Sequence, residues 1–306
     1  MIVKGIVPPL VSPLNEDGTI DVAGTINMID HCIRGKADGI FLLGSCGEGS
    51  VLAKAERKLL IETALKGIDD RVPLLVGVLE TSAKKVVEEI LDLEKTGVKY
   101  FVVTPPYYLS TEVQGEILEH FRYISKRIHG KLIVYNIPSY VHSSIYPETM
   151  MELLSIDNVI SVKDSTGDWG MHQKALFLKQ EIRNYDSKSF MCGNEDFAYA
   201  SLSLGADGCV PCFANAYPEL YSRMQMAAKD KNTVGMVQCQ KVIGDLKEVL
   251  SMGASWIGVV KYLCSLKGLI QPYTGDGLPE LTDDQKREIR VKIGKIEKKH
   301  GLGNTV

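Results

Sequence analysis

The sequence predicts one (β/α)₈ barrel, also called a TIM barrel, with a C-terminal helical extension. Three segments share a local pattern in which a glycine precedes a short apolar run ending at Gly or Pro: KADGIFLLG (36–44), TGVKYFVVTP (96–105) and LGADGCVP (204–211). Runs this short, rich in Val, Ile and Phe, are typical of strands buried on both faces. Eight such strands alternating with helical patterns over about 220 residues match a closed barrel in number and length.

The candidate strands follow one another along the chain with amphipathic helices between them. Ile26, Ile29 and Ile33 recur at helical spacing before the second strand. Pro147 stands where the first turn of a helix tolerates proline. The eight strands are predicted at Gly5–Val11, Gly39–Leu43, Leu74–Val78, Tyr100–Val103, Leu132–Tyr135, Val159–Lys163, Phe190–Cys192 and Gly208–Val210.

A doubly wound open sheet is the main alternative to the barrel. Such folds place a phosphate-binding glycine turn after the first strand, whereas here that strand ends in Val11-Ser12-Pro13-Leu14 without a G-x-G-x-x-G motif. The barrel is therefore favoured. We predict that residues 1–229 form the catalytic barrel and that residues 230–306, which show only helical periodicity, form the extension.

The composition excludes several classes of protein. Of the 306 residues 45% are apolar and 24% charged, as in an ordinary globular chain. The 35 basic and 38 acidic side chains leave a formal charge of -3, so the chain lacks the excess positive charge that attracts nucleic acid. No apolar run approaches the length of a membrane span, and seven cysteines are an odd count for a disulfide framework. We expect a cytoplasmic protein that binds neither nucleic acid nor membrane.

The basic stretch QKREIRVKIGKIEKKH near the C-terminus could indicate an acidic partner. Charged helix faces are common, however, and we predict a solvated helix here with Ile289, Ile293 and Ile296 turned inward.

The residues that could take part in catalysis lie at the ends of the predicted strands, where (β/α)₈ enzymes have their active sites. Lys163 follows the apolar run NVISV, and burial there disfavours its ammonium form. A neutral amine can attack a carbonyl and form an imine, although a structural ion pair with Asp164 or Glu195 is the alternative. Tyr135 ends the neighbouring strand, so its phenol can move protons near the Lys163 amine. A core tyrosine is the alternative for Tyr135.

The loop Gly44–Gly49 offers a second kind of site. Its glycines expose backbone N–H groups before a helix, which suits a carboxylate or phosphate, although tight turns need glycine for steric reasons alone. Cys209-Val210-Pro211-Cys212 lacks the second pair that a zinc site needs, and the six histidines show no ligand-like spacing. We therefore predict no metal site, and the imine chemistry expected of Lys163 would need no organic cofactor.

Together these motifs resemble the dihydrodipicolinate synthase and N-acetylneuraminate lyase superfamily, the pyruvate-dependent class I aldolases. The resemblance covers nearly the whole chain. It runs from PLVSPL (9–14) through GSCGEGSVL, VVTPPYY, VYNIP and VKDSTGD to GNEDF, LGADGCV and Val260-Lys261. The tyrosine of YNIP and the lysine of VKDST lie 28 residues apart, and this ordered pair is the most specific feature.

The resemblance implies a role for individual residues. Lys163 would form the Schiff base and Tyr135 would shuttle protons, while Ser45 would link Tyr135 to Tyr108, which in the family reaches into a neighbouring subunit's site. Cys46 stands where the family usually has threonine and would hold the pyruvate carboxylate through its backbone N–H. The further substrate-binding positions that the resemblance implies are Val210, Gly193, Ser165 and Glu195.

One departure from the family pattern concerns the second substrate. Dihydrodipicolinate synthases carry an arginine two residues after the YNxP segment, where this chain has Tyr140, a neutral group that cannot form a bidentate ion pair. The candidate rim residues are mostly neutral hydrogen-bonding groups: Tyr140, His142, Ser143, Ser165, Glu195 and Asp196. We expect reversible cleavage of a 2-keto-3-deoxy sugar acid. The alternatives are dihydrodipicolinate synthesis from pyruvate and aspartate semialdehyde, and a barrel that binds a keto acid without turnover.

The segment Pro105-Pro106-Tyr107-Tyr108 places two large aromatic side chains on a stiff loop, where exposure in a monomer is costly. The resemblance implies a homodimer or a homotetramer built as a dimer of dimers, with Tyr108 shared across the tight interface. The alternative is a monomer whose tyrosines fold back on their own barrel.

Overall fold

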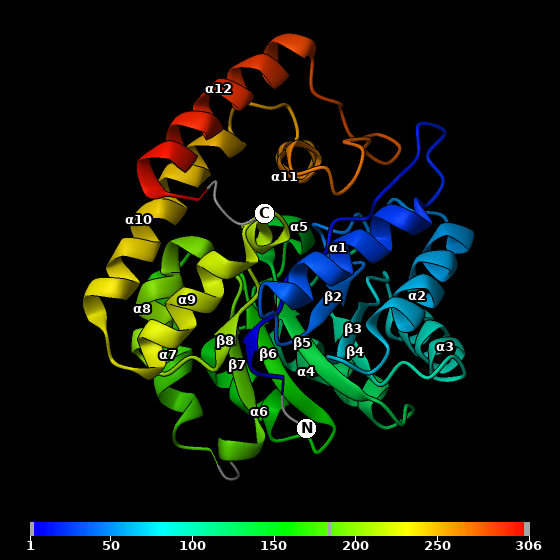
Figure 1. Cartoon of the computed structure of the whole chain (residues 1–306). Coiled ribbons are helices and arrows are strands. Elements are labelled where there is room, and N and C mark those ends of the chain that lie inside the picture. Colours follow the sequence, from blue (N-terminus) through cyan, green and yellow to red (C-terminus); the bar gives the residue numbers. More distant parts are fainter. Residues whose placement is uncertain (1–2, 183–184, 303–306) are drawn as a thin grey trace.

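The computed structural model describes residues 3–182 and 185–302. In this part of the chain eight parallel strands form one sheet in the order β1-β8-β7-β6-β5-β4-β3-β2 (Figure 1). The sequential pairing of parallel neighbours is that of a (β/α)₈ barrel, which confirms the predicted fold. The strands are β1 (Gly5–Ile6), β2 (Ile40–Leu42), β3 (Leu74–Gly77), β4 (Tyr100–Val103), β5 (Lys131–Asn136), β6 (Val159–Asp164), β7 (Ser189–Cys192) and β8 (Gly208–Cys209).

The barrel closes between β1 and β2 through the segment that follows β1. Leu10 N–H donates to the carbonyl of Phe41 at 2.8 Å, and Phe41 N–H donates to the carbonyl of Pro8 at 3.0 Å. The predicted first strand, Gly5–Val11, is therefore too long as a regular strand. Pro8 and Pro9 have no N–H to donate to a ladder, so regular pairing stops before them.

Nine α-helices accompany the strands in the described part of the barrel. The helices predicted around Ile26 and at Pro147 are present as α1 and α6. The helices are α1 (Val22–Arg34), α2 (Lys54–Ile68), α3 (Ala83–Glu94), α4 (Gln114–Ser125), α5 (Pro138–Val141), α6 (Pro147–Leu154), α7 (Trp169–Lys179), α8 (Ala198–Ser203) and α9 (Pro218–Lys229). Three short 3₁₀ turns lie at Tyr185–Ser187, Glu195–Phe197 and Cys212–Asn215.

Three helices follow the barrel: α10 (Thr233–Leu250), α11 (Trp256–Leu266) and α12 (Asp283–His300). Figure 1 shows them over the end of the barrel where the short helix α5 follows β5. The Thr282 side chain accepts a hydrogen bond from Gln285 N–H and forms a capping box that starts α12. Ile289, Ile293 and Ile296 are the buried residues of α12, as predicted. The domain boundary at residue 229 stays a prediction.

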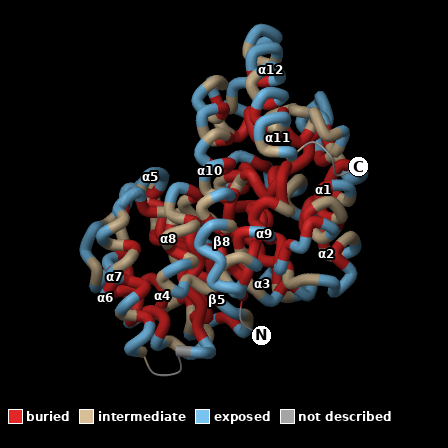
Figure 2. Tube along the Cα trace, turned by 60° about the vertical axis from the view of Figure 1, so that its left-hand side comes forward, coloured by how far each residue is buried: buried red, intermediate tan, exposed pale blue. Residues whose placement is uncertain are grey.

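The core consists of two clusters of buried residues; Figure 2 marks the buried segments in red. One lies inside the barrel and contains Tyr135, Ile160 and Met191, whereas the other lies between strands and helices and contains Val134 and Val162. Successive strand residues point to opposite faces. Among the described residues, no helix is both long and apolar enough to cross a membrane.

Candidate active site

Lys163 and Tyr135 meet inside the barrel, as the sequence predicts. They are direct register partners on β6 and β5. The Lys163 Nζ atom lies 3.9 Å from the centroid of the Tyr135 ring and 4.9 Å from that of Phe41. Lys163 is 5% exposed and Tyr135 3% exposed. An amine held against two aromatic rings, away from bulk water, is placed to react with a carbonyl.

Ser45 connects this pair to the loop after β2. Its Oγ atom lies 3.5 Å from the Tyr135 hydroxyl, at the limit of a hydrogen bond. The loop is pinned from the other side, because Ser12 Oγ donates to the carbonyl of Gly47 at 2.6 Å. Among the backbone hydrogen bonds of residues 3–182 and 185–302, none uses the N–H of Ser45 or Cys46. These two donors are therefore free for an anionic group.

The predicted Cys46 position is fully enclosed. The residue is buried, and burial raises the pKa of its thiol far above the ordinary range, so the side chain is a neutral thiol. Asn215 Nδ2 lies 3.9 Å from the Cys46 sulfur and also donates to the carbonyl of Pro9 at 2.9 Å. A thiol in this setting packs the loop and is not a nucleophile.

Three other predicted residues lie next to Lys163. A Cβ atom on Gly193 would fall 2.1 Å from Ser165 Oγ and 3.1 Å from Lys163 Cε, so a side chain there would force Ser165 to move and would crowd Lys163. Val210 is buried in the same interior cluster as Tyr135. The structure thus brings Gly193, Ser165 and Val210 together with the two predicted catalytic residues.

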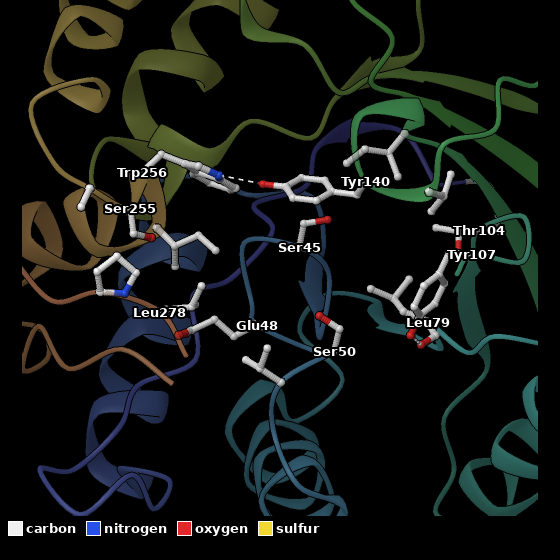
Figure 3. A pocket seen from close by; sticks show the side chains of 16 residues that line it. Ser45, Glu48, Ser50, Leu79, Thr104, Tyr107, Tyr140, Ser255, Trp256 and Leu278 are labelled. Carbon is white, nitrogen blue, oxygen red and sulfur yellow. Dashed lines mark hydrogen bonds between the residues drawn. The ribbon is translucent and has the colours of Figure 1, made fainter. Parts of the chain in front are cut away.

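A cavity of about 360 Å³ opens at this end of the barrel and reaches Ser45 (Figure 3). Its walls come from barrel loops and from the C-terminal extension. Hydroxyl groups are the main polar lining, from Ser45, Ser50, Thr104, Tyr107, Tyr140 and Ser255. The remaining lining residues are Glu48, Val51, Leu79, Ile137, Val141, Ala254, Trp256, Ile257, Leu278 and Pro279.

Tyr140 lies on the cavity wall and contacts the C-terminal extension. Trp256 Nε1–H donates to the Tyr140 hydroxyl at 2.9 Å, as Figure 3 shows. Because the hydroxyl accepts this bond, its own proton remains available to a ligand. Of the six candidate rim residues, Tyr140 alone is among the residues that line this cavity in the described part of the chain.

The other rim candidates make contacts within the protein. Ser143 Oγ donates to the carbonyl of Thr111 at 2.7 Å, and Asp196 pairs with Lys247. Glu195 is buried, and its carboxylate accepts hydrogen bonds from the Tyr221 hydroxyl and, at 3.1 Å, from Phe213 N–H. Burial raises the pKa of Glu195 despite these bonds. The role of Glu195 in substrate binding stays a prediction.

The two tyrosines of the loop after β4 differ in position. Tyr107 folds back, and its hydroxyl donates to the carbonyl of Leu79 at 2.9 Å. Tyr108 has a φ of 71° and is 88% exposed, so within one chain it does not reach Ser45. Its predicted role would require a second copy of the chain.

Sequence reasoning missed two wall residues. Thr104 is 3% exposed, lines the cavity, and has no hydrogen-bond partner for its hydroxyl among the described residues. Its place at the end of the fourth strand was a usable signal. No sequence signal identified Trp256 as a wall residue, because helical periodicity does not say where the extension packs against the barrel. Within residues 3–182 and 185–302, no group of three His, Cys, Asp or Glu side chains could hold a metal ion.

Comparison with known proteins agrees with this geometry. Residues 2–296 match the model of the dihydrodipicolinate synthetase family. The chain belongs to this family. It is 27% identical over 292 residues to the probable 2-dehydro-3-deoxy-D-pentonate aldolase YjhH of Escherichia coli K12, covering 95% of this chain and 96% of that one.

Two further relatives illustrate the breadth of the family. A 4-hydroxy-tetrahydrodipicolinate synthase of Rickettsia bellii is also 27% identical, over 95% of this chain and 97% of its own. The crystal structure of YagE from E. coli K12 in complex with pyruvate matches the fold with a TM-score of 0.91 and 24% identity, over 97% of this chain and 99% of that one. The chain is therefore a carbon–carbon lyase of this family, whose substrates are small molecules.

A buried ion pair joins the loop after β2 to the extension. Lys261 of α11 pairs with Glu48, and both side chains are 0% exposed. Lys261 Nζ also donates to the carbonyl of Tyr273 at 2.7 Å, and Gly275 N–H donates to Glu48 Oε1 at 2.7 Å. Glu48 is three residues from Ser45, so this pair fixes the loop against the helices that complete the cavity.

Replacement of Lys261 by methionine is expected to lower the free energy of unfolding by about 3–5 kcal/mol, because the buried Glu48 carboxylate keeps the hydrogen bond from Gly275 N–H but loses its counter-charge. The double variant Glu48→Gln/Lys261→Met should recover most of this loss. Urea denaturation of both variants measures the effect. The matched control is Lys174→Met, which removes an exposed ion pair with Glu148 and should cost less than about 1 kcal/mol. Unchanged stability in Lys261→Met would contradict the assignment.

Proposed function

We propose that the protein is a Schiff-base-forming class I aldolase that cleaves and forms a 2-keto-3-deoxy sugar acid. The observation that carries the proposal is the buried contact between Lys163 Nζ and the Tyr135 ring, with Ser45 Oγ 3.5 Å from the Tyr135 hydroxyl. The proposed nucleophile and proton carrier thus lie behind Ser45, which is the member of this group that lines the cavity in the described part of the chain.

The residues can perform the complete reaction. In cleavage, the Lys163 amine attacks C2 of the keto acid, and loss of water gives a protonated imine. Tyr135 supplies the proton with which this water leaves and becomes a phenolate. The phenolate takes the proton of the C4 hydroxyl, the C3–C4 bond breaks, and its electron pair moves into the imine to form an enamine. The aldehyde leaves, Tyr135 returns the proton to C3, and water hydrolyses the imine to release pyruvate and free Lys163. The imine serves as the electron sink.

The carboxylate of the pyruvate half has a suitable place in the loop after β2. The N–H groups of Ser45 and Cys46 are the donors available there, and backbone donors bind a carboxylate without a charged side chain. Because the contact uses the backbone, cysteine in place of the family's threonine leaves it intact.

The nature of the cavity supports a hydroxylated aldehyde as the other half. None of the described residues that line it is Lys, Arg or His, and its one acidic residue, Glu48, is paired with Lys261. A second carboxylate, as in aspartate semialdehyde, would have no cationic partner there. Hydroxyl groups such as those of Thr104 and Tyr140 suit a polyhydroxylated chain. The name of YjhH, a pentonate aldolase, points the same way.

Dihydrodipicolinate synthesis is the alternative activity, since the synthase of R. bellii is as similar in sequence as YjhH. A barrel that binds a keto acid without turnover is the second alternative. The joint presence of Lys163, Tyr135 and Ser45 argues against it, because binding alone has no use for a proton carrier.

The proposal includes assembly and location. The exposed Tyr108 supports a homodimer or a dimer of dimers in which Tyr108 completes the partner's site. All seven cysteines are free thiols, which supports a reducing compartment such as the cytoplasm.

Borohydride treatment in the presence of pyruvate should attach a reduced pyruvyl group to Lys163, because hydride traps the imine. Peptide mass spectrometry locates the adduct. Lys163→Arg should give no adduct at any residue, whereas the control Lys174→Ala, at an exposed site, should label like the parent protein. An unmodified Lys163 peptide in the parent protein would exclude the Schiff-base mechanism.

Steady-state kinetics on one preparation should give a larger kcat/KM for a 2-keto-3-deoxy sugar acid than for condensation of pyruvate with aspartate semialdehyde. Tyr140→Phe should lower kcat/KM for the sugar acid about tenfold, because a bound hydroxyl loses its partner. Pyruvate trapping at Lys163 should be unaffected by this change. A preference for aspartate semialdehyde would refute the proposed substrate.

Sedimentation velocity at assay concentration should show a dimer or tetramer. Tyr108→Phe should leave the assembly intact and reduce kcat by at least about tenfold, because the proton relay across the interface loses a hydroxyl. A fully active monomer would rule out a shared site.

A further inference from the structure

A buried polar chain lies behind the two predicted catalytic residues. Asn136 and Asp164, which follow Tyr135 and Lys163 in sequence, are also register partners. Because neighbouring strand residues point to opposite faces, this second pair lies on the outer side of the barrel wall. Asn136 Nδ2 donates to Asp164 Oδ1 at 2.7 Å and ties β5 to β6 at this point.

His172 holds the other side of the Asp164 carboxylate. Its Nδ1 atom on α7 lies 2.7 Å from Asp164 Oδ2, and its Nε2 atom lies 2.8 Å from Ser201 Oγ on α8. Asn136, Asp164, His172 and Ser201 are each 0% exposed. Two strands and two helices are thus linked by three successive side-chain hydrogen bonds without contact with solvent.

The surroundings of His172 are otherwise aromatic, apart from one thiol. Trp169 stacks on its ring at 5.6 Å and 23°, and the rings of Phe190 and Phe197 lie at 5.2 and 5.7 Å. The titratable groups that face it are Asp164 on β6 and Cys192 on β7.

His172 carries a positive charge in this setting. Burial alone lowers the pKa of His172, but the hydrogen bond to Asp164 and the neighbouring Cys192 outweigh burial and raise the pKa to about 9. At neutral pH the imidazolium of His172 therefore pairs with Asp164, and it also lies beside Cys192, whose pKa the contacts with Cys209 and His172 lower to about 6.

This ion pair has two effects on the site inside the barrel. First, it fixes the Asp164 carboxylate, which accepts the hydrogen bond from Asn136 Nδ2. This bond keeps β5 and β6 in the register that pairs Tyr135 with Lys163. Second, it places a positive charge beside a carboxylate that is one residue from Lys163. Inside the barrel, Lys163 faces Tyr135 and the neutral thiol of Cys46. An unbalanced Asp164 would favour the ammonium form of the lysine, which cannot attack a carbonyl.

We propose that His172 is a positioning residue for the imine chemistry and acts through Asp164 on both the alignment and the charge balance of Lys163. His172 touches neither the cavity nor the reacting atoms. The inference rests on the aldolase mechanism proposed above, in which Lys163 must be a free amine.

Two replacements of His172 separate geometry from charge. In His172→Asn the amide nitrogen can take the place of Nδ1 and still donate to Asp164, but the positive charge is lost. In His172→Gln the amide reaches toward Ser201 instead, so Asp164 loses both its donor and its counter-charge. Ser201→Ala is the matched control, because it removes the far hydrogen bond and leaves the imidazole and its charge in place.

The measurements are the rate of borohydride trapping of pyruvate against pH, and kcat and KM for the keto acid. His172→Asn should keep kcat at its optimal pH within about threefold of the parent value, with the trapping profile moved upward by about 0.5–1 pH unit. His172→Gln should show the same upward move and a kcat at least about tenfold lower, because the catalytic pair is misplaced. Ser201→Ala should keep the parent pH profile.

Thermal denaturation of each variant distinguishes this role from a purely structural one. A structural role predicts losses of activity that follow the loss of stability, with no move of the pH profile. Parent-like pH profiles in both His172 variants would overturn the inference, and if His172→Gln does not fold, His172→Asn against Ser201→Ala decides it. Absence of trapping in the parent protein would instead refute the proposed function.

Discussion

An irregularity in β6 turns Lys163 into the barrel, and the whole proposed site depends on it. Leu132 of β5 pairs with Val159, but the next residue, Ile133, pairs with Ser161, so β6 contains one extra residue at this point. With a regular register, alternation from the outward-facing Val159 would place Lys163 on the outer face. The extra residue reverses the alternation and pairs Lys163 with Tyr135. Bulges of this kind re-aim side chains next to active sites.

The barrel and the position of its chemistry could be predicted from the sequence, because both follow from simple rules. Short apolar runs separated by helical patterns define the strands, and the ends of parallel strands meet at one rim, so Lys163 and Tyr135 had to be close. The bulge in β6 could not be predicted, because nothing in the apolar run NVISV indicates that one of its residues is left out of the regular pairing. The first strand was overestimated because its apolar residues continue past the two prolines that end the regular pairing.

The cavity could be predicted only in part, because six of its sixteen lining residues belong to the extension. Periodicity identifies α11 as a helix but does not say which barrel loop it covers. In the structure, Lys261 of α11 pairs with Glu48, and Trp256 at its start donates to Tyr140. The extension is therefore part of the site as well as an addition to the barrel. Glu195 lies at a strand end in the sequence, but its carboxylate accepts a hydrogen bond from Tyr221 of α9 and the residue does not line the cavity.

The two departures from the family pattern, Cys46 and Tyr140, differ in whether the backbone or the side chain would contact the substrate. At Cys46 the proposed contact with substrate uses the backbone, so the side chain is free to change as long as it packs, and a buried neutral thiol does. At Tyr140 the side chain itself faces the cavity, so the change from arginine alters what can bind. In the proposed reaction, the first departure leaves the binding of the pyruvate half intact, whereas the second changes which aldehyde the rim can bind. A chain can in this way keep one half-reaction fixed by its strands and loop backbone and change its substrate at the rim.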